Sequence, residues 1–462
     1  MLAEFPSIAA LATALRARAI TSAAITDRCL AAIAERDASL NAFIAVLGDA
    51  ARAQARQADT ELAQGRDRGP LHGVPLSLKD LVDVDGVPTT AASRVRRDHV
   101  AGADALVTSR LREAGAVFIG KTNLHEFAFG TTNEDSAYGP ARHPVDPTRS
   151  PGGSSGGSAV SIATSMAFGS IGTDTGGSIR IPSAACGLVG LKPSLGEIPT
   201  DGVVPLSTTL DHVGPMARTV ADAGLLFDVL RGAPITRVAG VDIRGKRLAV
   251  PREYFLSLLD AEVSSAFDAA CGRLRDAGAI LEDVAIPHAA DIAPVYLHIV
   301  LAEAAAYHAR TLETRPGDYT PNVRIRLEMG RYVLAEDYAR ALRGRDRLRR
   351  EVDDALQRRD ALLLPSLAVP APKIGASTMR VGGVDEPVRN LMLRLTQLFN
   401  VTGHPALTLP CGVTREQLPI GAQLVGAAGQ TRALLDVAAA AEPVIGGSAS
   451  RNPAYLGPGR SR

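Results

Sequence analysis

The sequence predicts an α/β fold, on three observations. From Leu71 onward, short apolar segments typical of strands alternate with longer segments typical of helices. The same rhythm returns after residue 245 and continues almost to the end of the chain. With 462 residues, 46% of them hydrophobic, the chain can form a large core, and length alone would suggest two to four domains. Such alternation is typical of helices packed on a sheet.

Two packing helices precede the first predicted strand. Thr21 or Ser22 can cap a helix over residues 23–36. A second helix begins near Asp49 and ends just before Gly65. We therefore expect a helical region over about residues 5–65.

The alternating region holds the remaining predicted elements. Strands are predicted at 73–79, 116–121, 168–173, 246–251, 279–287, 361–366, 405–410 and 420–426. Helices are predicted at 104–115, 157–167, 264–278 and 431–442. The stretch from about 290 to 360 reads as mostly helical, with alternating charges typical of a solvated helix face. The tail, 446–462, is loose enough in composition to predict flexibility.

Charge and cysteine content argue against several classes of function. Fifty Lys and Arg against 49 Asp and Glu give a formal net charge of +1, so nothing electrostatic favours nucleic acid or an anionic membrane as partner. The four cysteines lie far apart without a C-x-x-C pair, which is typical of buried apolar residues rather than disulfides or zinc ligands. There is no secretory leader and no run of roughly 18 apolar residues, so we expect a cytoplasmic protein.

The segment SPGGSSGGSAV, residues 150–160, is rich in glycine and serine. It has the glycine spacing of a phosphate-binding loop, but Ser158 stands where that motif needs lysine. Residues 152–156 also satisfy G-x-S-x-G, the serine turn of α/β-hydrolases. That turn needs an apolar strand directly before it, whereas residues 141–150 are polar and contain two prolines. Neither motif explains the segment.

The histidines do not supply a catalytic base or a metal site. His212 and His404 lie near turn-like segments and are expected to be hydrogen-bonded loop or core residues. The segment HEFAF begins like a zinc motif, but Phe129 occupies the place of its second histidine. We therefore expect no metal.

A second glycine-serine cluster, residues 172–182, follows the first across a predicted helix and strand. Thr175, Gly176 and Gly177 can expose consecutive backbone N–H groups. Ser178 falls at a predicted helix start, where unpaired N–H groups and the helix dipole favour negative charge. The cluster predicts an oxyanion site with a nucleophilic serine attached.

Without a histidine, the base for such a serine is a lysine that burial keeps neutral. Lys79 ends the apolar strand predicted at 73–79, so its stem would be enclosed by neighbouring strands. A lysine at a strand end could equally reach solvent, and would then be useless as a base.

Three stretches carry a family resemblance. Lys79 in LSLKDLVDVDGVPTT, the serines of GGSSGGSAV and Ser178 in GTDTGGSIRIPSAACGLVGLKPS resemble the amidase signature family. The interval from Ser154 to Ser178, 24 positions, is the one in that family's motif. The resemblance extends over about residues 5–445, with a signature core at about 71–220.

The resemblance implies a single large α/β domain, 1–445, with a mixed, mostly parallel central sheet covered by helices. It implies a Ser-cisSer-Lys triad in which Ser178 is the nucleophile, Ser154 the bridging serine after a cis peptide bond, and Lys79 the base. The N–H groups of residues 175–178 would form the oxyanion hole, and no cofactor is needed. Ser155, Asp174 and Arg180 match further family positions and are expected to brace these loops.

Two kinds of enzyme share this triad. One is a free-standing amidase acting on small amides, which we favour. The other is the A subunit of a glutamine-dependent aminoacyl-tRNA amidotransferase, which works with partner subunits. The segment before NVTGHP lacks the acidic residue that would select a glutamine amino group, which argues against the amidotransferase subunit. Arg326 argues for it, because its segment resembles the region that grips the glutamine carboxylate. The alternative is that Arg326 lies on a helix surface.

A catalytically inactive, amide-binding relative is the third alternative, and the presence of all three triad residues argues against it. We expect the substrate pocket to come from the helical region near 290–360 and from loops around Tyr138 and residues 399–404. The oligomeric state stays open, a homodimer included.

Overall fold

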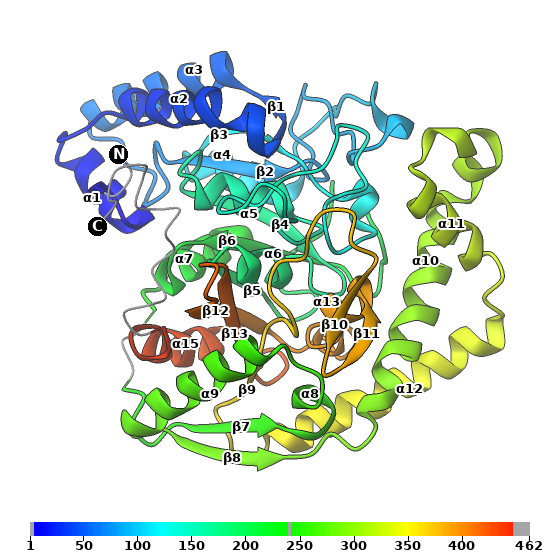
Figure 1. The fold of residues 1–462 in the computed structure, drawn as a ribbon. Coiled ribbons are helices and arrows are strands. Elements are labelled where there is room, and N and C mark those ends of the chain that lie inside the picture. The colour runs from blue at the N-terminus through cyan, green and yellow to red at the C-terminus, as the bar shows by residue number, and fades with distance from the viewer. Residues whose placement is uncertain (1–3, 239–241, 447–462) are drawn as a thin grey trace.

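An eleven-stranded sheet runs through the protein, in the order β1-β3-β2-β4-β6-β5-β12-β13-β9-β7-β8 (Figure 1). The computed structural model describes residues 4–238 and 242–446. The sheet is continuous, so the chain forms one domain rather than the several that its length suggests. Its strands are β1 (Phe43–Val46), β2 (Pro75–Lys79), β3 (Val117–Thr122), β4 (Gly169–Asp174), β5 (Val189–Lys192), β6 (His212–Ala217), β7 (Arg247–Pro251), β8 (Ile280–Val284), β9 (Ala361–Pro365), β12 (Ala406–Val413) and β13 (Pro419–Val425).

The sheet is mixed, as expected, but it is not mostly parallel. Within the described sheet, β2 pairs in parallel with β3 and β4, and β7 with β8 and β9, whereas the other six neighbouring pairs are antiparallel. Two of the central antiparallel strands, β5 and β6, escaped prediction because Gly190, Gly214 and Pro215 are typical of turns. A separate hairpin, β10 (Thr378–Val381) and β11 (Val384–Pro387), was also missed.

Helices cover both faces of the sheet (Figure 1). Strand β9 shows why: Ala361 and Leu363 join the core cluster that contains α9 and α15, while Leu362 and Leu364 join the cluster that contains α10 and α12. The helices are α1 (Ile8–Arg16), α2 (Ser22–Leu40), α3 (Gly48–Ala63), α4 (Leu106–Glu113), α5 (Gly156–Ala163), α6 (Arg180–Ala185), α7 (Val220–Leu230), α8 (Glu253–Leu256), α9 (Ala261–Asp276), α10 (Ile292–Thr314), α11 (Pro321–Gly330), α12 (Ala335–Leu356), α13 (Val388–Leu393), α14 (Leu398–Val401) and α15 (Thr431–Ile445).

The N-terminal helices follow their predicted caps closely. Thr21 is the N-cap of α2, and its hydroxyl accepts a hydrogen bond from the Ala24 N–H at 3.1 Å. Ser22 is instead the first helical residue, and its hydroxyl donates to the carbonyl of Gly73. Gly65 lies just past the end of α3 with a φ of +78°, a conformation that favours glycine.

Helices α10, α11 and α12 form the predicted helical region and stand together at one side of the sheet (Figure 1). Within the described residues, the stretch Ala289–Thr314 is long and apolar enough to cross a membrane by length and composition alone. Half of the apolar 18-residue segment within this stretch is buried inside the protein. Glu303, within it, accepts hydrogen bonds from Ser207 and Thr209. These contacts are those of a core helix.

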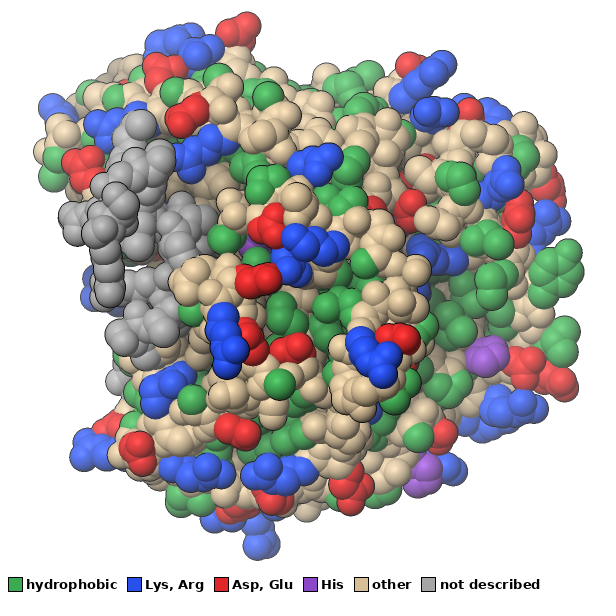
Figure 2. Space-filling model, viewed as in Figure 1, with side chains coloured by type: hydrophobic (Ala, Val, Ile, Leu, Met, Phe, Trp, Pro, Cys, Tyr) green, Lys and Arg blue, Asp and Glu red, His purple; other side chains and the backbone are tan. Residues whose placement is uncertain are grey.

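The visible surface carries mixed charge. Figure 2 shows Lys and Arg interspersed with Asp and Glu over the face that it presents. Such a face offers no extended area of positive charge for nucleic acid. The predicted tail, apart from Gly446, lies outside the described residues.

Candidate active site

Lys79 is the last residue of β2, between two parallel neighbours, β3 and β4. Its side chain is fully buried. The Nζ atom lies 2.8 Å from the Ser154 hydroxyl oxygen and 2.7 Å from the Thr173 hydroxyl oxygen. Burial lowers the pKa of Lys79 to about 7, although the negative charges of Asp174 and Asp211 oppose this shift. A large fraction of this amine is therefore neutral near pH 7.

Burial alone does not distinguish Lys79, because Lys121 and Lys192 are also fully buried. Lys121 forms an ion pair with Asp80 at 2.9 Å. Burial holds the pKa of Lys192 well below its ordinary value, and its amine donates to the Pro193 carbonyl. Within the described residues, Lys79 is the one of these three lysines whose amine hydrogen-bonds to a serine.

Ser154 lies in the glycine-serine loop before α5, and the Gly153–Ser154 peptide bond is cis. Its carbonyl accepts a hydrogen bond from the His125 N–H at 3.0 Å. Two glycines let this loop approach its neighbours: a β-carbon at Gly153 would lie 2.7 Å from the Asn133 nitrogen, and one at Gly157 would lie 2.3 Å from the Ala42 carbonyl oxygen. The glycine content of the segment therefore follows from packing of its backbone.

Ser178 lies on the next loop, between β4 and α6. Two hydrogen bonds of Ser155 join the loops: its N–H donates to the Ser178 carbonyl at 3.3 Å, and its hydroxyl donates to the Thr173 carbonyl at 3.2 Å. Ser178 is 6% exposed, whereas Ser154 is fully buried. In the described part of the chain, the Ser178 hydroxyl has no hydrogen-bond partner. The structure thus joins the Lys79 amine to the Ser154 hydroxyl by a hydrogen bond. A backbone hydrogen bond from Ser155, the next residue along the chain, holds Ser178 beside this pair.

The Ser178 loop presents backbone N–H groups. Across residues 4–238 and 242–446, the N–H groups of Gly176, Gly177 and Ser178 have no hydrogen-bond acceptor. Gly177 has a φ of +144°, which L residues rarely adopt. The Gly176 carbonyl is held by the Thr396 hydroxyl at 2.6 Å, and the Thr175 hydroxyl donates to Asp211. Unpaired N–H groups held in this way can receive an oxygen that gains negative charge.

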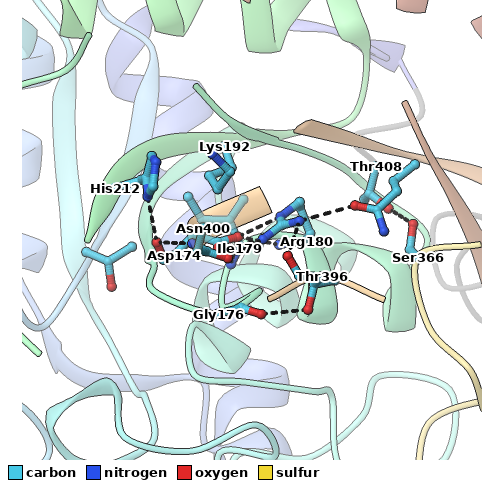
Figure 3. A network of polar contacts seen from close by, with 12 residues as sticks. Asp174, Gly176, Ile179, Arg180, Lys192, His212, Ser366, Thr396, Asn400 and Thr408 are labelled. Carbon is cyan, nitrogen blue, oxygen red and sulfur yellow. Dashed lines mark hydrogen bonds and ion pairs between the residues drawn. The ribbon is translucent and has the colours of Figure 1, made fainter. Parts of the chain in front are cut away.

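Helix α6 begins at Arg180, two residues after Ser178, and is held by a buried ion pair with Asp174 (Figure 3). Both side chains are fully buried. Asp174 also accepts hydrogen bonds from the Ile179 N–H and from the Asn400 side chain. Arg180 donates further to the Thr396 carbonyl and to Asn400. Burial opposes ionisation of Asp174, but the Arg180 charge holds its pKa well below the usual range.

The two predicted substrate-binding residues have different surroundings. Tyr138 is 39% exposed. Its backbone is bonded to Asn41 and Ser136, and no hydrogen bond within the described residues links it to the two serine loops. Arg326, on α11, donates to the Phe129 carbonyl at 2.7 Å, and Phe129 is the last residue of the segment HEFAF that begins at His125.

Three residues at the site were missed from the sequence. Thr173 contacts the Lys79 amine, Asp211 accepts hydrogen bonds from Thr175 and from two backbone N–H groups, and Asn400 bonds to Asp174. Asn400 stands in the segment NVTGHP and Thr173 lies in the second glycine-serine cluster, so their positions were available as a signal. Their side-chain partners lie too far along the chain to be inferred.

The histidines take structural positions. His212 is buried, and its Nδ1 lies 2.7 Å from the Leu210 carbonyl. His404 is buried between Thr402 and Asp353. Within the described residues, no group of three or more His, Cys, Asp and Glu side chains is arranged to hold a metal ion.

Known proteins share this architecture. The sequence profile of the Amidase family matches residues 24–435. The chain is 40% identical to the A subunit of glutamyl-tRNA(Gln) amidotransferase from Chloroflexus aurantiacus, over 91% of this chain and 92% of that one. It is 40% identical to an amidase of Pseudomonas putida, over 89% of this chain and 90% of that one. A crystal structure of an amidase superposes with a TM-score of 0.91 and 36% identity, over 95% of this chain and 100% of that one.

Fold and relatives together define an amidohydrolase, an enzyme that acts on carbon–nitrogen amide bonds. The chain belongs to the Amidase family, the family of the amidase signature enzymes.

Proposed function

We propose that this protein is an independent amidase that hydrolyses a small carboxylic amide to the carboxylate and ammonia or an amine through an acyl-enzyme on Ser178. The observation that carries the proposal is the 2.8 Å contact between the Lys79 amine and the Ser154 hydroxyl, made by a lysine whose pKa burial lowers to about 7. A neutral amine can accept a proton, whereas a charged one cannot.

In the first half of the reaction, the Ser178 oxygen attacks the amide carbonyl and its proton passes through Ser154 to Lys79. The carbonyl oxygen gains negative charge and is stabilised by the N–H groups of residues 175–178. When the carbon–nitrogen bond breaks, Ser154 returns a proton to the leaving nitrogen. An acyl ester on Ser178 and a neutral amine result.

In the second half, water attacks the ester and gives its proton to the same relay. The ester bond breaks, Ser178 recovers its proton and the carboxylic acid leaves. The two halves together consume one water molecule, release the amine and the carboxylic acid, and need no cofactor. Ser155 joins the two loops through its bonds to Ser178 and Thr173, and Asp174 and Arg180 brace the Ser178 loop where α6 begins.

The test combines activity with covalent labelling. Ser178→Ala should lower ammonia release from aliphatic and aromatic amides by at least about 10³-fold, because it removes the nucleophile. A fluorophosphonate should label Ser178 and leave the variant unmodified. Ser158→Ala, in the same glycine-serine segment, is the matched control and should keep both properties, since within the described residues the Ser158 hydroxyl bonds to Thr122 and to no residue of the candidate site. Full turnover by Ser178→Ala would overturn the proposal, and a folded but unlabelled wild type would favour an amide-binding protein.

The second candidate is a glutamine-hydrolysing subunit of an aminoacyl-tRNA amidotransferase, favoured by the likeness to the Chloroflexus aurantiacus protein. The chain should be assayed alone and with amidotransferase partner subunits. Hydrolysis of glutamine that appears only with partners would favour this candidate, whereas hydrolysis of simple amides by the chain alone would favour the independent amidase.

We place the enzyme in the cytoplasm. The four cysteines are buried and form no disulfide bond within the described residues, which suits a reducing compartment. Cell fractionation with an antibody to the native protein tests this location.

A further inference from the structure

Apolar side chains are concentrated on the exposed side of α11 and on the turn that follows it. Among the described residues, fourteen large hydrophobic side chains are exposed, and four of them fall within residues 325–334. Ile325, Met329 and Leu334 are each more than half exposed, and Tyr332 is 84% exposed. We call these four residues the α11 patch. Figure 2 shows hydrophobic side chains gathered on the side of the molecule where α10 and α11 lie in Figure 1. Such a concentration is typical of a surface that another molecule covers.

The patch lies on the face of α11 opposite to the one that packs on the protein. The buried residues of this helix are Val323, Leu327 and Gly330. Gly330 packs directly on α10, because a β-carbon there would clash with the Leu301 carbonyl oxygen. An α-helix turns by about 100° per residue, so Ile325 and Met329 lie on one face and point away from the buried positions. The exposed apolar residues therefore form a second, separate stripe along the helix.

Hydrogen bonds fix α11 on the rest of the protein. Arg326 donates to the Phe129 carbonyl at 2.7 Å. The Thr320 N–H, directly before the helix, donates to the Glu126 carboxylate at 2.7 Å. The patch is thus presented by a helix whose position is already set. A molecule that covers it needs to order little additional chain, which favours binding.

Charged pairs of balanced sign flank the patch. Arg324 and Glu328 form one ion pair along α11, and Arg331 and Glu313 form another. Helices that lie on anionic membranes carry mainly Lys and Arg beside their apolar face, whereas these two glutamates would repel such a membrane. A partner of one predominant charge would meet as much repulsion as attraction here. The balance therefore favours a partner whose own surface carries both signs in the same way.

We propose that the α11 patch is the contact between two copies of this chain, in which the two α11 helices pack antiparallel about a twofold axis. Such an axis places the same surface on both sides of the contact, so that surface must be complementary to itself. Ile325 of one copy would face Met329 of the second. Arg324 and Glu328 each come one residue before a patch residue and so lie on the same side of the stripe. In the antiparallel arrangement each Arg324 comes within reach of Glu328 of the second copy.

The first test measures the dimer and removes its apolar contact. Sedimentation velocity should show a dimer of the wild type at about 50 µM, since a small contact of this kind binds in the micromolar range. Ile325→Glu and Met329→Glu should each raise the Kd of the dimer at least about 100-fold, because the symmetry brings two new carboxylates into an apolar contact. Val384→Glu is the matched control, because Val384, on the β10–β11 hairpin, is as exposed as Met329 and lies outside the patch.

The control should dimerise like the wild type, and circular dichroism checks that each variant is folded. A wild type that stays monomeric at this concentration overturns the proposal. So does a folded Ile325→Glu variant that dimerises as well as the wild type. A monomeric wild type that instead binds vesicles of anionic phospholipid would assign the patch to a membrane.

A charge exchange identifies the second copy as the occupant. Arg324→Glu makes both flanking positions acidic and Glu328→Arg makes both basic, so each variant alone should dimerise roughly tenfold more weakly than the wild type. An equimolar mixture of the two variants should recover the dimer, since every acidic position then faces a basic one. Native mass spectrometry should show one copy of each variant in these dimers. A mixture that dimerises no better than the separate variants would overturn the antiparallel pairing.

Discussion

The Thr173 hydroxyl lies 2.7 Å from the Lys79 amine; Lys79 ends β2, and Thr173 is the last residue but one of the neighbouring parallel strand β4. Both side chains are buried, so the threonine hydroxyl and the Ser154 hydroxyl together hold the amine in place. The Thr173 carbonyl simultaneously holds Ser155. One residue thus positions both the proposed base and the loop of the proposed relay serine.

Thr173→Val should lower kcat by roughly 10- to 100-fold with a smaller effect on KM. Valine keeps the shape of threonine and the backbone carbonyl that holds Ser155, but removes the hydroxyl that positions the amine. Steady-state kinetics checks this, with Thr173→Ser as the control that restores the hydroxyl and should recover most of kcat. Equal activity of the valine and serine variants would contradict a positioning role.

Lys79→Met should inactivate the enzyme and also stabilise it at neutral pH. Keeping this lysine neutral at pH 7, against an ordinary pKa of 10.5, costs about 4–5 kcal/mol, and the two lost hydrogen bonds offset about 2 kcal/mol of the gain. We therefore expect the free energy of unfolding to rise by about 2–3 kcal/mol, measured by urea denaturation.

The same variant has a predicted pH dependence. Between pH 7 and 10.5 the unfolded chain holds a proton on Lys79 that the folded chain has lost, so the lysine's cost to stability falls as pH rises. The advantage of Lys79→Met should therefore be largest at or below pH 7 and small above pH 10.5. An advantage that does not change with pH would mean that Lys79 is charged in the folded protein.

The pH profile of kcat/KM should rise through about pH 7, where Lys79 loses its proton and becomes a base. Asp211, whose own pKa burial raises to about 6, is ionised at that pH and favours the charged lysine. Asp211→Asn should therefore move the midpoint of the rise to lower pH. A midpoint that is unchanged or moves upward would contradict this electrostatic link.

Arg180→Met should destabilise the protein by roughly 3–5 kcal/mol, because it leaves the buried carboxylate of Asp174 without its counter-charge. Urea denaturation of Arg340→Met, which removes an exposed partner of Asp337, provides the comparison and should show a loss of at most about 1 kcal/mol. Similar losses in the two variants would mean that solvent reaches Asp174.

Much of the fold follows from local sequence pattern. Strand β2 ends at Lys79 as predicted, and β3, β4, β7, β9 and β13 lie within a few residues of their predicted positions, because each is a short apolar run bounded by turn residues. Strands β5 and β6 could not be found in this way, since their glycines and proline are tolerated only through pairing with each other and with β4 and β12.

The residues of the candidate site likewise differ in whether the local sequence indicates them. Lys79, Ser154 and Ser178 stand in motifs that a family resemblance identifies. Thr173 contacts the Lys79 amine because of the register in which β2 and β4 pair. Asp211 contacts Thr175 from a loop 36 residues further along the chain. Asn400 was missed because nothing local in its segment indicates that it meets Asp174, 226 residues earlier. Partners that are distant in sequence are determined by packing, which a single sequence does not display.

The helices that carry Tyr296 and Arg326 belong to one excursion of the chain, between the end of β8 at Val284 and the start of β9 at Ala361. Strand β7 lies between these two strands, so the excursion leaves the sheet on one side of β7 and returns to it on the other. Connections of this kind tolerate changes in length at little entropic cost. A relative's excursion grafted between these two strands should therefore exchange the range of amides accepted while the chemistry of bond cleavage stays with the host.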